Sequence, residues 1–156
     1  MITIKNDFKN ISKHYKQLVK ITKQHYFVGI TNEWIVDNYY LLIKNKSGLK
    51  QFLKDSKQNK YLTKNCDMIK MLSTILENRN YKIDEDILIG DIKNYCKQNN
   101  INLIYQEIKI IPVTLLIILI KKISEICTKE NEKLKEKQEI DQFIKKMKAA
   151  FSKNEK

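Results

Sequence analysis

Apolar residues recur at helical spacing along most of this chain, with lysine, asparagine and acidic residues between them. This spacing places side chains on one face of an α-helix and therefore predicts helices. Only 3 Gly and 1 Pro interrupt the pattern, which argues against sheets with many tight turns. We expect one all-α domain over residues 1–156, a bundle of about six or seven helices. The expected segments are residues 3–25, a helix capped by Thr31, a short helix within 48–64, residues 66–76, a helix capped by Asp84, residues 103–127 and residues 129–150.

The expected helix over residues 103–127 is the most apolar segment and should form the centre of the bundle. Asn102 precedes it, and Pro112 should bend it because the proline ring removes one backbone hydrogen bond. From Ile110 to Ile120 apolar side chains cover every side of the helix. This run rises only about 16 Å, against a membrane hydrocarbon core of about 30 Å. It therefore predicts a buried core helix and not a membrane span.

The C-terminal segment, residues 129–156, is amphipathic only in its second half. Its first residues are almost all polar, and apolar side chains then form a stripe flanked by Lys145, Lys146 and Lys148. We expect this helix to leave the body and dock its stripe on a partner: the rest of a larger protein, a second copy of the chain or an anionic membrane surface. The alternative is that the stripe packs on the chain's own helices. The stripe consists of Ile140, Phe143, Ile144, Met147 and Phe151.

Composition and charge narrow the class of protein without defining its function. Charged residues make up 31% of the chain and the formal net charge is +12, which excludes an integral membrane bundle. The cationic residues are lysines except for Arg79, and lysine attracts phosphate without reading bases. A solvated lysine surface is the simpler interpretation. The alternative is a small Lys-rich helical protein that binds nucleic acid weakly and without sequence preference.

The cysteines and histidines indicate neither a metal site nor a cofactor site. Cys66, Cys96 and Cys127 are isolated from one another and from His14 and His25, so the spacing of a zinc site is absent. Isolated thiols are typical of a reducing compartment, and the N-terminus shows no secretory signal. We expect a cytoplasmic protein that holds no metal and no cofactor.

The most informative run extends from Glu33 to Ile43 in the second expected helix. Helical spacing places Glu33 and Asp37 on one side, where they form either a functional carboxylate pair or part of a solvated face. Trp34 and Asn38 share the other, apolar side. We therefore expect Trp34 to be buried. Asn38 should form a hydrogen bond within the core, because a buried amide without a partner costs about 1–3 kcal/mol.

Acidic residues at two further positions allow a catalytic or a structural interpretation. Glu107 falls on the apolar side of the helix over residues 103–127, where a carboxylate needs a partner or a proton. A structural ion pair explains it more simply than a catalytic acid does. The sequence Asp84-Glu85-Asp86 has the D-x-D form with which glycosyltransferases hold a metal ion and a sugar nucleotide. Its position at a helix start is explained by capping.

A motif in the N-terminal helical region of bacterial cyclic β-1,2-glucan synthases resembles the run Glu33-Trp34-Ile35-Val36-Asp37-Asn38-Tyr39-Tyr40. The similarity continues in order over residues 31–127. Later motifs of that region are similar to Tyr81-Lys82-Ile83-Asp84 with Leu88, to Leu103 through Ile108, and to Ile111-Pro112-Val113-Thr114-Leu115. Around Lys60-Tyr61-Leu62 the chain departs from the family pattern.

Such synthases are large membrane proteins that join a glycosyltransferase using UDP-glucose to a glycoside-phosphorylase-like module. The resemblance covers only the cytoplasmic helical region ahead of the transferase and carries over no catalytic residue. It implies a non-catalytic accessory or scaffold module, either a fragment or a small stand-alone relative, at the inner face of the membrane. We expect no enzyme activity from this chain alone. A small independent enzyme is a third alternative, for which no nucleophile, metal cluster or phosphate loop is visible. Our candidates for structural or interface roles are Glu33, Trp34, Asp37, Asn38, Tyr39, Glu107, Pro112, Ile140, Phe143, Ile144 and Met147.

Overall fold

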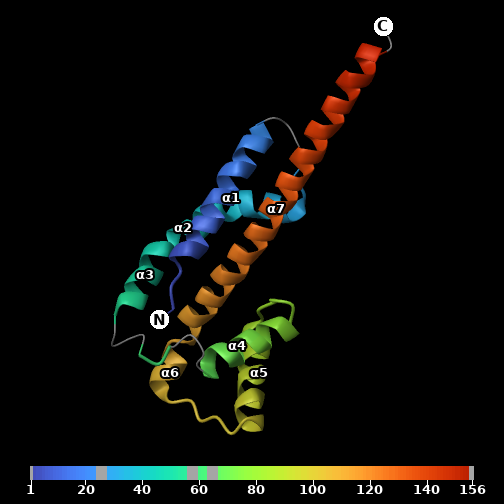
Figure 1. Ribbon diagram of the computed structural model, residues 1–156. Helices are drawn as coiled ribbons and strands as arrows, with labels where there is room; N and C mark the ends of the chain where they lie inside the picture. The colour runs from blue at the N-terminus through green and yellow to red at the C-terminus, as the bar shows by residue number, and fades with distance from the viewer. Residues whose placement is uncertain (1, 24–27, 56–59, 63–66, 155–156) are drawn as a thin grey trace.

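The structure is a computed structural model that describes residues 2–23, 28–55, 60–62 and 67–154. Over these residues the chain forms helices and no strand, which confirms the predicted all-α fold class. Figure 1 shows the helices in chain order. They are α1 (Lys5–Lys23), α2 (Ile30–Lys44), α3 (Lys46–Lys54), α4 (Asp67–Asn78), α5 (Glu85–Gln98), α6 (Tyr105–Lys109) and α7 (Ile111–Asn154).

The first half of α7 is the axis on which the other helices are arranged (Figure 1). α1 packs along it, and α2 in turn packs against α1 and leads into α3. On another side of α7 lies α4, which carries α5. A central apolar helix therefore organises the bundle, as the sequence predicts, although its bounds differ from those expected.

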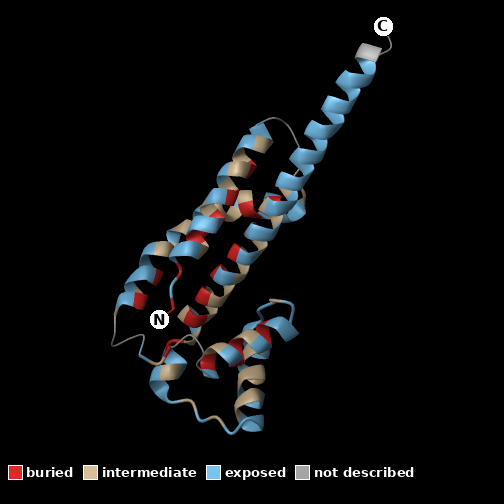
Figure 2. Ribbon diagram, viewed as in Figure 1, coloured by how far each residue is buried: buried red, intermediate tan, exposed pale blue. Residues whose placement is uncertain are grey.

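The core lies where α1, α2, α4 and the first half of α7 face one another (Figure 2). α1 buries Phe8, Ile11 and Leu18 on one face, and each such side chain stabilises the fold by about 1.5–3 kcal/mol. A polar contact fixes how α1 lies along α7, because Lys121 Nζ donates to Asp7 Oδ2 at 2.8 Å. The same ammonium also donates to a backbone carbonyl ahead of α1.

The long C-terminal helix differs from the sequence prediction of two helices over residues 103–127 and 129–150. α7 runs without interruption from Ile111 to Asn154. The polar segment after Thr128 contains neither glycine nor proline, so nothing in it ends the helix. Ion pairs one turn apart support the helix there: Lys129 Nζ lies 3.0 Å from Glu125 Oε1, and Lys133 Nζ lies 3.5 Å from Glu130 Oε1.

The predicted bend at Pro112 is wrong, because the chain changes direction before the proline. Residues 105–109 form the short helix α6, and α7 starts afresh at Ile111. Pro112 therefore lies in the first turn of α7, where backbone N–H groups have no partner within the helix and a proline removes nothing. The following residues Thr114, Ile117 and Ile120 are buried. No helix over the described residues is long and apolar enough to cross a membrane.

Three predicted helix starts can be compared with the structure. Asp84 caps α5 as predicted, since its Oδ1 accepts a hydrogen bond from the backbone N–H of Ile87 at 3.2 Å. Thr31 does not cap α2: Gly29 does, with φ at 92°, a conformation that favours glycine. Asn102 does not open the next helix either, because the residue at the N-cap position of α6 is Ile104.

Candidate functional site

A chain of polar side chains crosses the interior where α1, α2 and α7 meet. The ring nitrogen Nε2 of His14 lies 2.8 Å from Asn32 Oδ1. Asn32 Nδ2 donates to Val28 O at 2.8 Å and to Glu130 Oε2 at 3.2 Å. His14 and Asn32 are both buried. This polar chain therefore ties α1, α2 and α7 together at the level where α7 leaves the body.

The partners of Asn32 fix both its orientation and the tautomer of His14. The two acceptors on one side, Val28 O and Glu130 Oε2, require the amide nitrogen there, so Oδ1 faces His14. An amide oxygen only accepts, and Nε2 of His14 therefore carries the hydrogen. Nδ1 of His14 is buried and has no hydrogen-bond partner among the described residues.

Sequence reasoning missed this network, although the helical pattern contains a signal for it. The sequence pattern assigns no partner to His14 and gives Asn32 no role. His14 lies between Ile11 and Leu18 on the buried face of α1, and Asn32 precedes Ile35 on the buried face of α2. A polar residue within an apolar face on each of two packed helices predicts a bond between them.

The predicted burial of Trp34 and Asn38 is wrong. The Trp34 side chain is 48% exposed. Asn38 Nδ2 donates to Trp34 O at 2.8 Å, a bond within its own helix at the surface. α2 is apolar on two sides, and the side that packs on α1 is centred on Ile35 and Leu42, about a quarter turn from Trp34.

A second side of α2, rotated away from its buried face, is an apolar surface in contact with solvent. We define the α2 outer face as Ile30, Trp34 and Leu41, of which Ile30 is 82% exposed and Leu41 is 60% exposed. Glu33 and Asp37 are exposed beside it. These two acids therefore border an apolar surface and do not line an enclosed site.

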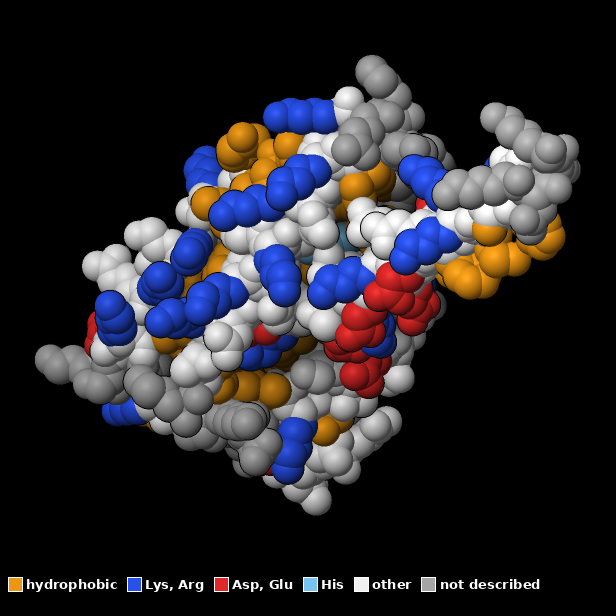
Figure 3. Space-filling model, turned by 45° about the horizontal axis from the view of Figure 1, so that its top comes forward, with side chains coloured by type: hydrophobic (Ala, Val, Ile, Leu, Met, Phe, Trp, Pro, Cys, Tyr) orange, Lys and Arg blue, Asp and Glu red, His pale blue; other side chains and the backbone are white. Residues whose placement is uncertain are grey.

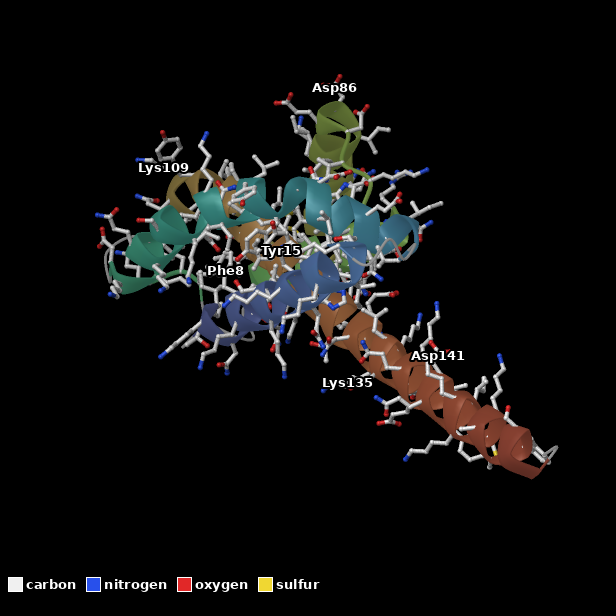
Figure 4. The ribbon with its side chains drawn as sticks, turned by 90° about the horizontal axis from the view of Figure 1, so that it is seen from above. Phe8, Tyr15, Asp86, Lys109, Lys135 and Asp141 are labelled. Atoms are coloured by element: carbon white, nitrogen blue, oxygen red, sulfur yellow. The ribbon has the colours of Figure 1, made fainter. Side chains whose placement is uncertain are left out.

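Tyr39, a residue of the family-like motif, belongs to an aromatic cluster that joins α1 to α2. Its ring stacks on that of Tyr15 with centroids 3.7 Å apart, and Tyr40 packs edge-on against both rings. Figure 4 shows Tyr15 between the two helices. The Tyr39 hydroxyl also lies 3.0 Å from Ser12 Oγ. A hydrogen bond with Tyr40 is the main cause that raises the pKa of Tyr15, followed by burial.

Glu107 has a structural role, but it does not form the suggested ion pair with any residue that the structure describes. Its Oε1 accepts a hydrogen bond from the backbone N–H of Ile104 at 3.2 Å, at the start of α6. Glu107 is half-buried, and it lies in the first turn of α6, where a carboxylate is favoured by the helix dipole. The predicted place of Glu107 on the apolar side of a helix over residues 103–127 is wrong, because the chain breaks between α6 and α7.

The acidic and sulfur-containing residues do not assemble a metal site among the described residues. Asp84, Glu85 and Asp86 are exposed at the start of α5. Cys96 Sγ contacts Met71 Sδ at 3.7 Å, and burial raises the pKa of its thiol. Cys127 is fully buried in α7, and burial raises the pKa of its thiol to about 12. Cys66 lies outside the described residues.

The second half of α7 extends beyond the other helices into solvent (Figures 1 and 2). We define the arm as residues 135–152, all of which are exposed, over a length of about 27 Å. Lys135 and Asp141 lie on it, away from the body (Figure 4). The stripe of Ile140, Phe143, Ile144, Met147 and Phe151 is on the arm, and Figure 3 shows apolar side chains gathered along one side of it.

The stripe does not continue the buried face of α7. The side chains that face the core include Ile117, Ile120 and Cys127. At about 100° per residue, the stripe is centred roughly 150° around the helix from that face. Because α1 packs on the buried face of α7, it would leave the stripe uncovered even if it were longer. This argues against packing of the stripe on the chain's own body.

Comparison of the chain with models of protein families, with curated proteins and with solved structures gives no match.

Proposed function

We propose that this chain is a non-catalytic scaffold module of a cyclic-β-1,2-glucan-synthase-like glycosyltransferase, in which the arm is the docking element. The observation that carries the proposal is the continuity of α7. Its first half is packed in the core, whereas residues 135–152 are exposed. A helix shared between body and arm holds whatever binds the arm at a fixed distance and direction from the body.

The exposed stripe supports a docking role for the arm. Phe143 is 62% exposed, and Ile140 and Phe151 are exposed to a similar extent. Large apolar side chains aligned on one face of a solvent-exposed helix are typical of a surface that a partner covers. The order of motifs over residues 31–127 supports the link to glucan synthases, and a location at the cytoplasmic face of the membrane is part of the same proposal.

A binding measurement tests this function. The purified chain is titrated onto a purified cyclic-β-1,2-glucan-synthase-like glycosyltransferase that lacks its own N-terminal helical region, and heat of binding is recorded. We expect saturable binding that weakens at least about tenfold when the chain ends after Lys135. Absence of binding, or equal binding without the arm, contradicts the proposal. Turnover of UDP-glucose by the chain alone contradicts its non-catalytic part.

A second candidate function, nonspecific binding of nucleic acid, is favoured by the distribution of lysines. Lysine side chains gather over the half of the molecule formed by α1 to α3 (Figure 3). Lys46, Lys50 and Lys54 line an open hollow on α3. If this surface binds nucleic acid, the anisotropy of a labelled oligonucleotide should report an affinity that falls steeply with salt and does not depend on sequence.

A further inference from the structure

The stripe of the arm and the α2 outer face are two of the apolar surfaces that lie exposed among the described residues. Each surface runs along one helix. In both, a second apolar residue lies four positions after the first, and a third lies eleven positions after the first. Each surface therefore extends about 16 Å along its helix. The matching residues are Ile30, Trp34 and Leu41 on α2 and Ile140, Ile144 and Phe151 on the arm.

The charges that border the two surfaces are opposite in sign along the first half of α2 and the second half of the stripe. Glu33 and Asp37 are exposed beside the α2 outer face. Lys146 and Lys148 border the second half of the stripe, one on each side, whereas Glu139 and Asp141 border its first turn. Complementary charges at the rim of an apolar contact select the partner and the register. In a chain with a formal net charge of +12, a border made of two acids is suited to a lysine-bordered surface.

We infer that the stripe of one copy of this chain docks on the α2 outer face of a second copy. The inference goes beyond the proposed function, since it names a surface of the chain itself that the arm binds. The arm does not reach its own α2, because α7 is one continuous helix that carries the stripe away from the body (Figure 4). Each copy carries both surfaces, so two reciprocal contacts close a pair.

An anionic membrane is a poorer partner for the same surfaces. The lysines beside the stripe would attract it, but Glu136, Glu139 and Asp141 lie on the same arm and would be repelled. The acids beside the α2 outer face would oppose binding of that face to the same bilayer. A second copy covers both apolar surfaces and pairs the lysines beside the second half of the stripe with the acids of α2.

Trp34 is the only tryptophan, and its position in the α2 outer face makes it a direct reporter of docking. The full chain is studied over a concentration series by sedimentation velocity, with the emission spectrum of Trp34 recorded on the same samples. We expect a monomer with red-shifted emission at low concentration. As pairs form, the emission should shift to the blue and quenching by acrylamide should decrease.

Three variants separate the two surfaces. Ile144→Glu with Met147→Glu disrupts the stripe, and Ile30→Glu with Leu41→Glu disrupts the α2 outer face. Both leave Trp34 in place and change only exposed side chains, so the body should fold normally. Gln142→Glu adds a charge to the side of the arm away from the stripe and is the matched control. Each disrupted variant should pair at least about tenfold more weakly than the chain, whereas the control should pair normally.

Mixing the two disrupted variants gives the decisive result. One retains an intact α2 outer face and the other an intact stripe, so the mixture should form a pair that neither forms alone, with a blue shift from the copy whose α2 is intact. A chain that stays monomeric overturns the inference. So does pairing that survives loss of the α2 outer face, or stripe-dependent binding to phosphatidylglycerol vesicles without pairing. If the chain pairs through α2 but does not bind the glycosyltransferase, the proposed function fails and the inference stands.

Discussion

His14 donates the hydrogen on its Nε2 to Asn32 Oδ1 across 2.8 Å of the protein interior, and this bond joins α1 to α2. Asn32 in turn reaches Glu130 on α7, so one amide connects three helices. The bond is placed below the arm, where few apolar side chains remain to hold α7 against the body. The bond should therefore stabilise the end of the body from which the arm projects.

Replacing Asn32 with alanine should lower the free energy of unfolding by about 1–3 kcal/mol, because His14 Nε2–H then lacks a partner in the interior. Urea unfolding followed by circular dichroism measures the loss. Asn38→Ala is the matched control on the same helix: its amide bonds the carbonyl of Trp34 at the surface, and its loss should be much smaller. Equal losses for the two variants would contradict the role given to Asn32.

Asp84 should matter to stability as a helix cap and not as a metal ligand. Asp84→Ala should reduce stability by about 0.5–2 kcal/mol, whereas Asp84→Asn should be nearly neutral because asparagine caps a helix as well. Asp86→Asn is the control, since Asp86 is exposed in the first turn. Turnover of UDP-glucose with Mn²⁺ that disappears in Asp84→Asn and Asp86→Asn would show that these carboxylates serve chemistry.

Cys127 should be far less reactive than Cys96 in the folded chain. Burial raises the pKa of the Cys127 thiol to about 12, so almost none of it is thiolate at neutral pH, and the side chain is also shielded. In a Cys66→Ser background, alkylation by iodoacetamide followed by mass spectrometry should modify Cys96 first. Both sites should react at similar rates in urea. Rapid modification of Cys127 without unfolding would show that α7 does not bury it.

The pair formed by Arg79 and Asp91 should make stability depend slightly on pH. The guanidinium donates two hydrogen bonds to the carboxylate, at 2.9 and 3.0 Å, and this contact lowers the pKa of Asp91. A carboxyl whose pKa is lower in the folded state contributes stability above its unfolded pKa. That contribution is lost as the pH falls through the folded pKa. The pair is exposed and screened, so the effect should be small.

Carboxyl titration by NMR checks this assignment directly. Arg79→Gln should return the pKa of Asp91 toward its ordinary value, and Lys82→Gln, which removes the same charge nearby, should change it much less. An unchanged pKa in Arg79→Gln would contradict the contact.

The fold class and the positions of most helices follow from the sequence because apolar spacing determines them locally. The Asp84 cap could be predicted for the same reason, since an acid before an apolar periodic segment needs no distant partner. Which side of α2 packs on α1 could not be predicted. The helix carries Ile35 and Leu42 on one side and Trp34 and Leu41 on another, and only the packed neighbour decides between them.

The break before α7 escaped prediction because proline has two opposite meanings. Within a helix Pro112 would cause a bend, and in a first turn it is neutral; the choice depends on whether the preceding residues already form a separate helix. The exposure of the stripe was predictable only as one of two alternatives. Its rotation away from the core face of α7 becomes evident once Ile117, Ile120 and Cys127 are known to face the body.

We propose that the arm serves docking and adds nothing to the core. The most direct test compares the urea unfolding free energy of the full chain with that of a chain ending after Lys135, at a protein concentration low enough to prevent pairing. A chain ending after Thr128, which lacks Glu130 and the partly buried Leu134, is the control. We predict equal stability for the first two chains and a loss of at least about 1 kcal/mol for the control. A comparable loss on removing residues 136–156 alone would show that the stripe belongs to the core and would contradict the account.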